Sequence, residues 1–219
     1  MVTQSTHLFI EKYPLNPKHK RLVLGTIHPL REERFLTPFF YGNRNSIWGI
    51  LRDAFPAYFK AKSQEEITLE EILEFLERGE ISMSDTVLSC DRTGDSAQDS
   101  ALTNIELNIG LVAQIKNSTI NQIFFTSSFG KNSAFRLFYE GILKKKISAD
   151  MKTKRDFVDE QTFGRPVRYT LLLSPSGSAM RSIVRSKEYR EVQESYKNQK
   201  SPVKQFRIDC YRKAFSFIK

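Results

Sequence analysis

The chain has 219 residues and a net charge of +9, and 40% of its residues are hydrophobic, which excludes a wholly disordered protein. Its longest apolar runs, such as 171–173, are far shorter than the ~18 residues that a membrane-spanning helix needs. Two cysteines, three scattered histidines and the lack of a signal-peptide pattern predict a cytoplasmic protein without a disulfide framework, metal site or cofactor.

The first part of the chain has the pattern of one strand followed by two helices. Residues 21–26 form a short apolar run that leads into a loop, which predicts a buried strand. Apolar residues at helical spacing predict a helix over 46–55 that ends before Pro56. Thr68 and Glu71 have the spacing of a capping box, which predicts a second helix that stops at Gly79.

The rest of the chain continues this alternation. Strands are predicted at 84–90, 121–127 and 168–173, and helices at 104–116, at 132–143 and, as a pair, within 185–218. Alternating strands and helices favour a parallel sheet covered on both faces. We therefore expect an α/β protein, a three-layer α/β/α sandwich with a central, mainly parallel four-stranded sheet. It would form a single domain over 1–219, with a basic insert at about 144–166.

Basic side chains are concentrated in two segments. Residues 144–155 contain five lysines and an arginine, and residues 181–190 contain three arginines and a lysine. Positive charge favours polyanions, chiefly through phosphate contacts and counterion release. A lysine-rich surface on an ordinary soluble protein gives the same totals, so charge alone leaves both interpretations open.

Ligands of parallel α/β sheets bind beyond the carboxyl ends of the strands, which here points to loops 25–45, 90–101, 127–131 and 174–181. His28 in the first loop is a candidate base or water-positioning group, and the alternative is an ordinary loop histidine. The last loop, SPSGSAMR, offers hydroxyls, backbone N–H groups and Arg181 to a phosphate, and the alternative is a generic turn.

The two middle loops carry weaker signals. Residues 128–133, SFGKNS, lack the first glycine of a P-loop and are better explained as a helix start capped by Asn132 or Ser133. Residues 91–100, DRTGDSAQDS, hold three acids but lack the final glutamate of an EF-hand loop. We interpret this stretch as a polar surface or ligand-lining loop.

Residues 39–51, FFYGNRNSIWGIL, place a Gly-Asn-Arg-Asn turn between aromatic rings and a helix. This stretch, with GTIHP at 25–29, DTVLSCDRTGDS at 85–96 and SPSGSAMR at 174–181, resembles the uracil-DNA glycosylase superfamily. The RNSIW element and the 85–96 stretch are most similar to its hypoxanthine-DNA glycosylase-like branch, and the last loop is similar to its mismatch-specific uracil/thymine branch. The resemblance covers roughly residues 20–217, with the motifs in the same order.

The resemblance implies a DNA repair enzyme that hydrolyses the N-glycosidic bond of a flipped deaminated or mismatched base, hypoxanthine or uracil. It gives the catalytic task to Asn45, with His28 and Asp85 as further candidates for holding the water. The mismatch-specific branch has an asparagine for this purpose in its first motif, whereas this chain has a longer turn and His28. Asn45 could instead cap the helix that follows it, and Asp85 could make a structural hydrogen bond.

The resemblance also implies the remaining contacts with DNA. Phe40 and Tyr41 would bind the base, and stacking of the base on Phe40 would contribute about 1–3 kcal/mol. Trp48 is expected to be a core anchor beneath them. The residues that would contact DNA phosphates are Ser174, Ser176, Gly177, Ser178 and Arg181.

The reaction would be a simple hydrolysis, because no lysine lies in the three catalytic motifs to form a Schiff base. We expect a monomer that binds damaged or mismatched DNA and no membrane. Two other functions fit the residues. One is a non-catalytic nucleic-acid-binding protein on the same fold, and the other is a nucleotide- or small-molecule-binding α/β protein that uses the same strand ends.

Overall fold

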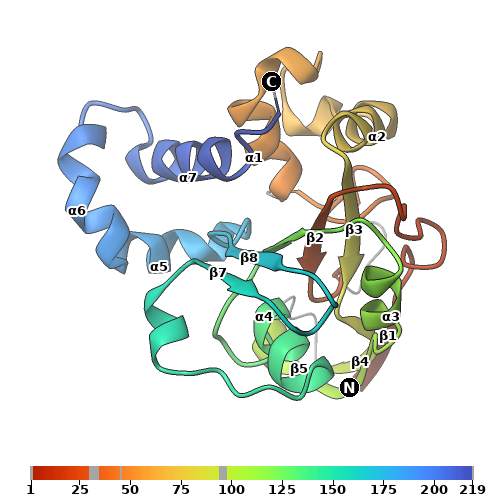
Figure 1. Cartoon of the computed structure of the whole chain (residues 1–219). Coiled ribbons are helices and arrows are strands. Elements are labelled where there is room, and N and C mark those ends of the chain that lie inside the picture. Colours follow the sequence, from red (N-terminus) through yellow and green to blue (C-terminus); the bar gives the residue numbers. More distant parts are fainter. Residues whose placement is uncertain (1, 30–34, 45, 94–97, 219) are drawn as a thin grey trace. The chain divides into compact units, whose positions relative to one another are not determined.

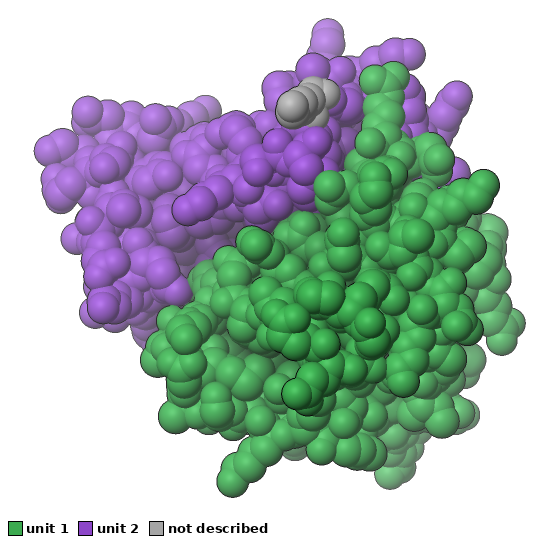
Figure 2. All heavy atoms as spheres, viewed as in Figure 1, with its two compact units in different colours: residues 1–32, 76–172 green, residues 33–75, 173–219 purple. Residues whose placement is uncertain are grey.

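The computed structural model describes residues 2–29, 35–44, 46–93 and 98–218. Within these residues the chain is a mixed α/β protein with two sheets (Figure 1). The chain separates into two compact units (Figure 2), of which unit 1 contains residues 1–32 and 76–172 and unit 2 contains residues 33–75 and 173–219. None of the helices in the described residues is long and apolar enough to cross a membrane. The single glycosylase-like domain stays a prediction.

The larger sheet of unit 1 is mostly parallel, as predicted. Within the described residues its order is β3 (Ile81–Asp85), β2 (Arg21–Gly25), β6 (Gln122–Phe125), β8 (Val167–Leu171) and β7 (Asp156–Asp159). Only β7 runs antiparallel to its neighbour. The sheet thus has five strands in the described residues where four were expected, and the three-layer sandwich is not confirmed. The sequence gives no sign of β7, because DFVD is a short edge strand with acids at both ends.

The second sheet of unit 1 is antiparallel and was not predicted. It consists of β1 (Val2–Thr6), β4 (Val87–Thr93) and β5 (Leu102–Leu107), with β4 in the middle. The strand predicted at 84–90 is divided at Thr86, where the chain leaves the larger sheet for the second one. Thr86 fixes this transition, because its N–H and its hydroxyl both donate to the Gly25 carbonyl, at 3.0 and 3.1 Å.

The helix predicted over 104–116 is wrong in its first half. Residues 102–107 form β5, and helix α3 covers only Leu111–Lys116. The segment LTNIEL supplies apolar residues at spacings that fit either a helix or a strand. Backbone pairing with β4 decides in favour of the strand, which is a tertiary effect that local propensity does not contain.

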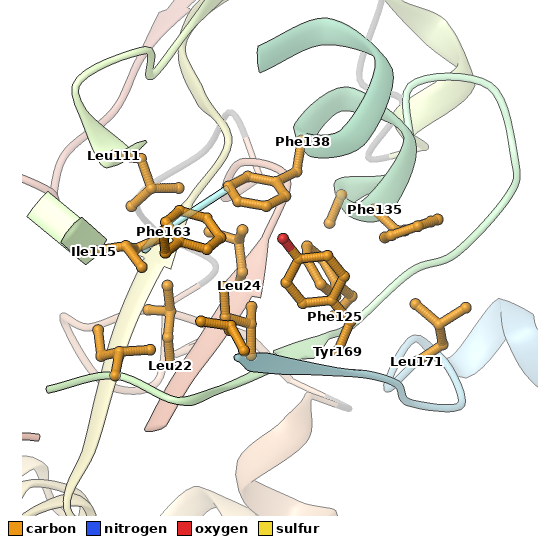
Figure 3. Close-up of a cluster of buried hydrophobic side chains, with 14 of the residues drawn as sticks. Leu22, Leu24, Leu111, Ile115, Phe125, Phe135, Phe138, Phe163, Tyr169 and Leu171 are labelled. Carbon is orange, nitrogen blue, oxygen red and sulfur yellow. The ribbon is translucent and has the colours of Figure 1, made fainter. Parts of the chain in front are cut away.

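The core of unit 1 lies on one face of the larger sheet (Figure 3). Side chains of a strand alternate between faces, so Leu22 and Leu24 of β2 point to the same side as Phe125 of β6 and Tyr169 of β8. Helix α3, the short helix α4 (Ala134–Arg136) and the π-helix η5 (Leu137–Ile142) contribute the side chains that cover them. The aromatic rings meet edge to face, with centroids of Phe125 and Tyr169 5.6 Å apart.

Unit 2 is helical. Its helices are α1 (Ile47–Ala54), most of α2 (Leu69–Arg78), α5 (Met180–Arg185), α6 (Lys187–Tyr196) and α7 (Pro202–Ala214), with 3₁₀ turns at Pro56–Tyr58, Gln64–Glu66 and Gly177–Ala179. The capping box of α2 is confirmed, because the Thr68 N–H donates to the Glu71 carboxylate at 3.0 Å and the Glu71 N–H donates to the Thr68 hydroxyl at 3.2 Å. The helix pair predicted within 185–218 corresponds to α6 and α7.

A buried polar network fixes the basic segment 144–166 to the sheet. The ammonium of Lys145 lies 2.6 Å from the carboxylate of Asp159, the last residue of β7. The hydroxyl of Tyr169 on β8 donates to the same carboxylate at 3.1 Å, and so does the hydroxyl of Thr162. The Asp159 side chain is 5% exposed, and these donors hold its pKa well below its usual range despite its burial.

We expect Asp159→Asn to lower the free energy of unfolding by about 2–4 kcal/mol, because it leaves a partly buried ammonium without its counterion. Urea denaturation measures the change. Asp150→Asn is the matched control, since Asp150 in the 3₁₀ turn Asp150–Thr153 pairs with Lys154 at 2.8 Å but is 71% exposed. That substitution should change stability by less than about 1 kcal/mol, and equal effects of the two would contradict the structural role of Asp159.

Candidate active site

The carboxyl ends of three parallel strands meet at one edge of the larger sheet. Strand β2 is hydrogen-bonded to β3 on one side and to β6 on the other, with Gly25 opposite Asp85 and Leu24 opposite Phe125. The residues that follow these strands therefore lie close together. This is the edge at which parallel sheets bind ligands.

Asp85 ends β3 at this edge and is 3% exposed. Its Oδ2 atom lies 2.7 Å from His7 Nε2. Its Oδ1 atom is buried and has no hydrogen-bond partner among the described residues. A buried carboxylate oxygen without a donor is costly, so such an atom indicates a place for a water or a ligand group.

His7 orients Asp85. The Nδ1 atom of His7 accepts the N–H groups of Phe9 and Ile10, at 3.0 and 3.2 Å. The ring proton therefore lies on Nε2, which donates to Asp85. His7 could not be predicted from the sequence, because it lies 78 positions away from Asp85 in a segment without a recognisable motif. Only the pairing of β1 with β4 brings it to the strand edge.

His28 is buried beside His7, with ring centroids 5.0 Å apart. Its Nδ1 atom lies 2.7 Å from the Pro29 carbonyl oxygen, and its Nε2 atom accepts the Leu8 N–H at 3.1 Å. Burial lowers the pKa of His28 more than its hydrogen bond to Pro29 raises it, which favours the neutral ring. Both ring nitrogens are thus engaged, and a role as a base requires one of these bonds to open.

Asp99 is a second carboxyl group at the same edge. Its Oδ2 atom accepts the hydroxyls of Thr26, which follows β2, and Ser127, which follows β6, at 3.1 and 3.3 Å. Burial raises its pKa to about 6 against the effect of the two hydroxyls, and the charge of Asp85 adds to the rise. Asn132 holds the backbone in place by donating to the Asp99 carbonyl at 3.0 Å. The sequence predicts a polar surface or ligand-lining loop at 91–100 but does not distinguish Asp99 from the other acids of this stretch.

Two predicted site residues of unit 2, Phe40 and Tyr41, lie in a tight turn. Phe40 is 1% exposed, and its carbonyl accepts the indole N–H of Trp48 at 2.7 Å, with Trp48 itself buried as expected. Tyr41 has φ 55°, and Gly42 has no room for a side chain, since a Cβ atom there would lie 1.7 Å from the Thr37 oxygen. Asn45 lies outside the described residues.

Hydrogen bonds from Arg207 of helix α7 fix the 174–178 loop of unit 2. The Arg207 guanidinium donates from Nη1 to the carbonyls of Ser174, Pro175 and Ser176, at 3.4, 3.2 and 3.1 Å. Ser176, Gly177 and Ser178 are exposed, as a phosphate-contacting role requires, and so is Arg181. Arg207 is 8% exposed and was not predicted, because an arginine on a polar helix has no distinguishing pattern in the sequence.

No protein-family model and no curated protein matches this chain. The resemblance to uracil-DNA glycosylases therefore depends on the motifs of the sequence. Among the described residues, no three His, Cys, Asp or Glu side chains are grouped in a way that could hold a metal ion.

Because His7 and Asp85 are both buried, we expect a large coupling energy between them in the free energy of unfolding. We expect His7→Ala to lower the free energy of unfolding by about 2–4 kcal/mol in the wild-type background and by less when Asp85→Asn is present, with a coupling of about 1–3 kcal/mol. Urea denaturation of the four proteins measures it. The same cycle on His19 and Glu77, which lie 3.1 Å apart with Glu77 75% exposed, should give less than about 1 kcal/mol. Equal couplings would contradict a buried pair.

The raised pKa of Asp99 predicts a pH dependence of stability. Because its folded-state pKa is about 6 instead of 3.8, its contribution to stability is present below about pH 4 and lost as the pH rises through 6. Asp99→Asn should therefore raise the free energy of unfolding by about 1–3 kcal/mol at pH 7 and leave it nearly unchanged at pH 4. Urea denaturation between pH 4 and 7 tests this, with Asp91→Asn as the control. A parallel shift at every pH would contradict the assignment.

Proposed function

We propose that this protein hydrolyses the N-glycosidic bond of a deaminated or mismatched base in DNA, with hypoxanthine or uracil as the base. The observation that carries the proposal is the Asp85 carboxylate. It is buried at the end of a parallel strand, with one oxygen held by His7 and the other without a partner in the described residues. A carboxylate placed in this way can orient a water molecule and accept its proton in a hydrolysis.

The two carboxyl groups at this edge suit the two halves of the reaction. Asp85 Oδ1 would take a proton from the water that attacks the sugar carbon, while the bond from that carbon to the base breaks and its electron pair passes to the base. Asp99 would give its proton to the departing base, and the hydroxyls of Thr26 and Ser127 would stabilise the carboxylate that remains. A carboxyl group with a pKa of about 6 carries that proton in part of the molecules near neutral pH.

DNA as the substrate is supported by the net charge of +9 and by the motif resemblance. The exposed hydroxyls of Ser176 and Ser178 lie 2.8 Å apart on the loop that Arg207 supports, where they suit a phosphate. The resemblance gives Phe40 and Tyr41 the base-contacting roles and Asn45 the catalytic role. Because Phe40 is 1% exposed, stacking of a base on its ring requires the turn around it to rearrange. The reaction is monofunctional and free of cofactors.

A non-catalytic nucleic-acid-binding protein is the second candidate. It is favoured by His28, the residue that this chain has in its first motif, because both ring nitrogens of His28 are already hydrogen-bonded. Such a protein would keep the phosphate-contacting loop with Ser176 and Ser178 but would release no base.

The test is a glycosylase assay on oligonucleotides that contain uracil, hypoxanthine, xanthine or a thymine mismatch, followed by alkaline cleavage. We expect release of at least one base, abolished by Asn45→Ala and slowed by Asp85→Asn about 10²- to 10⁴-fold in single turnovers.

Asp150→Asn removes a charge from an exposed turn of the same unit and should leave the rate unchanged. Circular dichroism would verify that all variants are folded. A full rate with Asp85→Asn would remove Asp85 from the mechanism. No release from any of the four substrates, despite salt-dependent DNA binding, would favour the non-catalytic candidate.

A further inference from the structure

The two basic segments of the sequence differ in how far the fold neutralises them. In 144–155, Lys145 pairs with Asp159 at 2.6 Å and Lys154 pairs with Asp150 at 2.8 Å. Arg155 donates to the Leu171 carbonyl at 3.4 Å. Two of the six basic side chains in this segment are thus paired with carboxylates at short distance.

The basic side chains on α5 and α6 of unit 2 are largely unneutralised. Arg181, Arg185 and Arg190 are exposed, and no carboxylate in the described residues lies within ion-pair distance of them. Lys187 pairs weakly with Glu191, with the charged atoms 3.6 Å apart. Exposed cations without counterions are available to a ligand, whereas paired cations must first lose their partners.

Most of these cations also line an open hollow on the surface. Arg185, Lys187, Arg190 and Glu191 line a surface depression of about 400 Å³ at the junction of α5 and α6. Three of the four lining groups are cationic and one is anionic. A depression lined mainly by one sign of charge concentrates ions of the opposite sign.

The junction that presents these cations is fixed by hydrogen bonds. The Ser186 hydroxyl donates to the Ile183 carbonyl at 2.8 Å and accepts the Tyr189 N–H at 3.2 Å, which ends α5 and caps α6. Ile183 and Tyr189 are buried on either side of this cap. The Arg190 guanidinium donates to the Arg185 carbonyl across the junction, so one of the cations is already oriented.

The net charge of the C-terminal segment, residues 173–219, also favours a polyanionic partner. Residues 173–219 contain eleven basic and four acidic side chains, a net charge of +7 out of the +9 of the chain. The remaining 172 residues are nearly neutral. The positive charge that suggested a polyanionic partner therefore belongs to the segment that forms α5, α6 and α7 (Figure 1).

We propose that the hollow at the α5–α6 junction is a docking surface for the phosphodiester backbone of DNA, with Arg185 and Arg190 as its phosphate-binding residues. Guanidinium groups bind phosphate oxygens through paired hydrogen bonds, which suits arginine better than lysine for this task. Lys187 adds charge, and Glu191 limits affinity for an anion. The choice of DNA among polyanions rests on the proposed function.

The experiment measures binding of an undamaged DNA duplex by fluorescence anisotropy between 50 and 200 mM salt. Arg185→Gln with Arg190→Gln should weaken binding about 10- to 60-fold at 0.1 M salt, and the slope of log affinity against log salt should fall by about 2. Glu191→Gln should tighten binding instead. Thermal denaturation would verify folding of each variant, and Glu191→Gln provides a test that does not depend on loss of function.

The control is Lys144→Gln with Lys146→Gln, which removes the same charge from exposed positions of unit 1. It should weaken binding less than about threefold, as expected for charges that contact no phosphate. Equal losses in the two double variants, or no tightening with Glu191→Gln, would overturn the proposal, and so would the lack of any duplex binding at 50 mM salt. Because the duplex is undamaged, failure of base release would not affect this result.

Discussion

The parallel pairing of β2 with β3 and β6 is the constraint on which the candidate site depends. Backbone hydrogen bonds fix the register so that Gly25 lies opposite Asp85 and Leu24 lies opposite Phe125. All three strands run in the same direction, so the polar residues that follow them lie at one edge although they are far apart in the sequence. A shift of one residue in this register would turn every side chain of the shifted strand to the other face of the sheet and would disrupt both the core and the site.

Burial gives the carboxyl groups at this edge their distinct properties. Removing a carboxylate from water costs several kcal/mol, and the protein offsets this cost differently for the two acids. Asp85 receives a hydrogen bond from a histidine whose other nitrogen is held by two backbone N–H groups. Asp99 accepts the hydroxyls of Thr26 and Ser127, and burial raises its pKa to about 6. Two acids at one strand edge thus differ in the hydrogen-bond donors that the fold gives them.

Charge is divided between structure and surface in a similar way. Lys145 and Arg207 are both basic and both serve the fold, one through a buried carboxylate and the other through three backbone carbonyls beneath the 174–178 loop. Arg185 and Arg190 face solvent without carboxylate partners in the described part of the chain. A count of basic residues does not separate these groups, since the difference lies in which acids and carbonyls the fold brings within reach.

Features that depend on neighbours within a few residues could be predicted from the sequence alone. Strands β2, β6 and β8, helix α1 and the capping box of α2 follow from apolar spacing and from contacts within a few residues. The sequence also named His28, in the loop after the first strand, and, through the resemblance, Asp85 as candidate site residues. Tertiary structure decided the second sheet, the edge strand β7 and the choice of strand over helix at 102–107, because each depends on backbone pairing with a distant segment. The same holds for His7, Asp99 and Arg207, whose partners are separated from them by tens of residues and whose properties arise from burial.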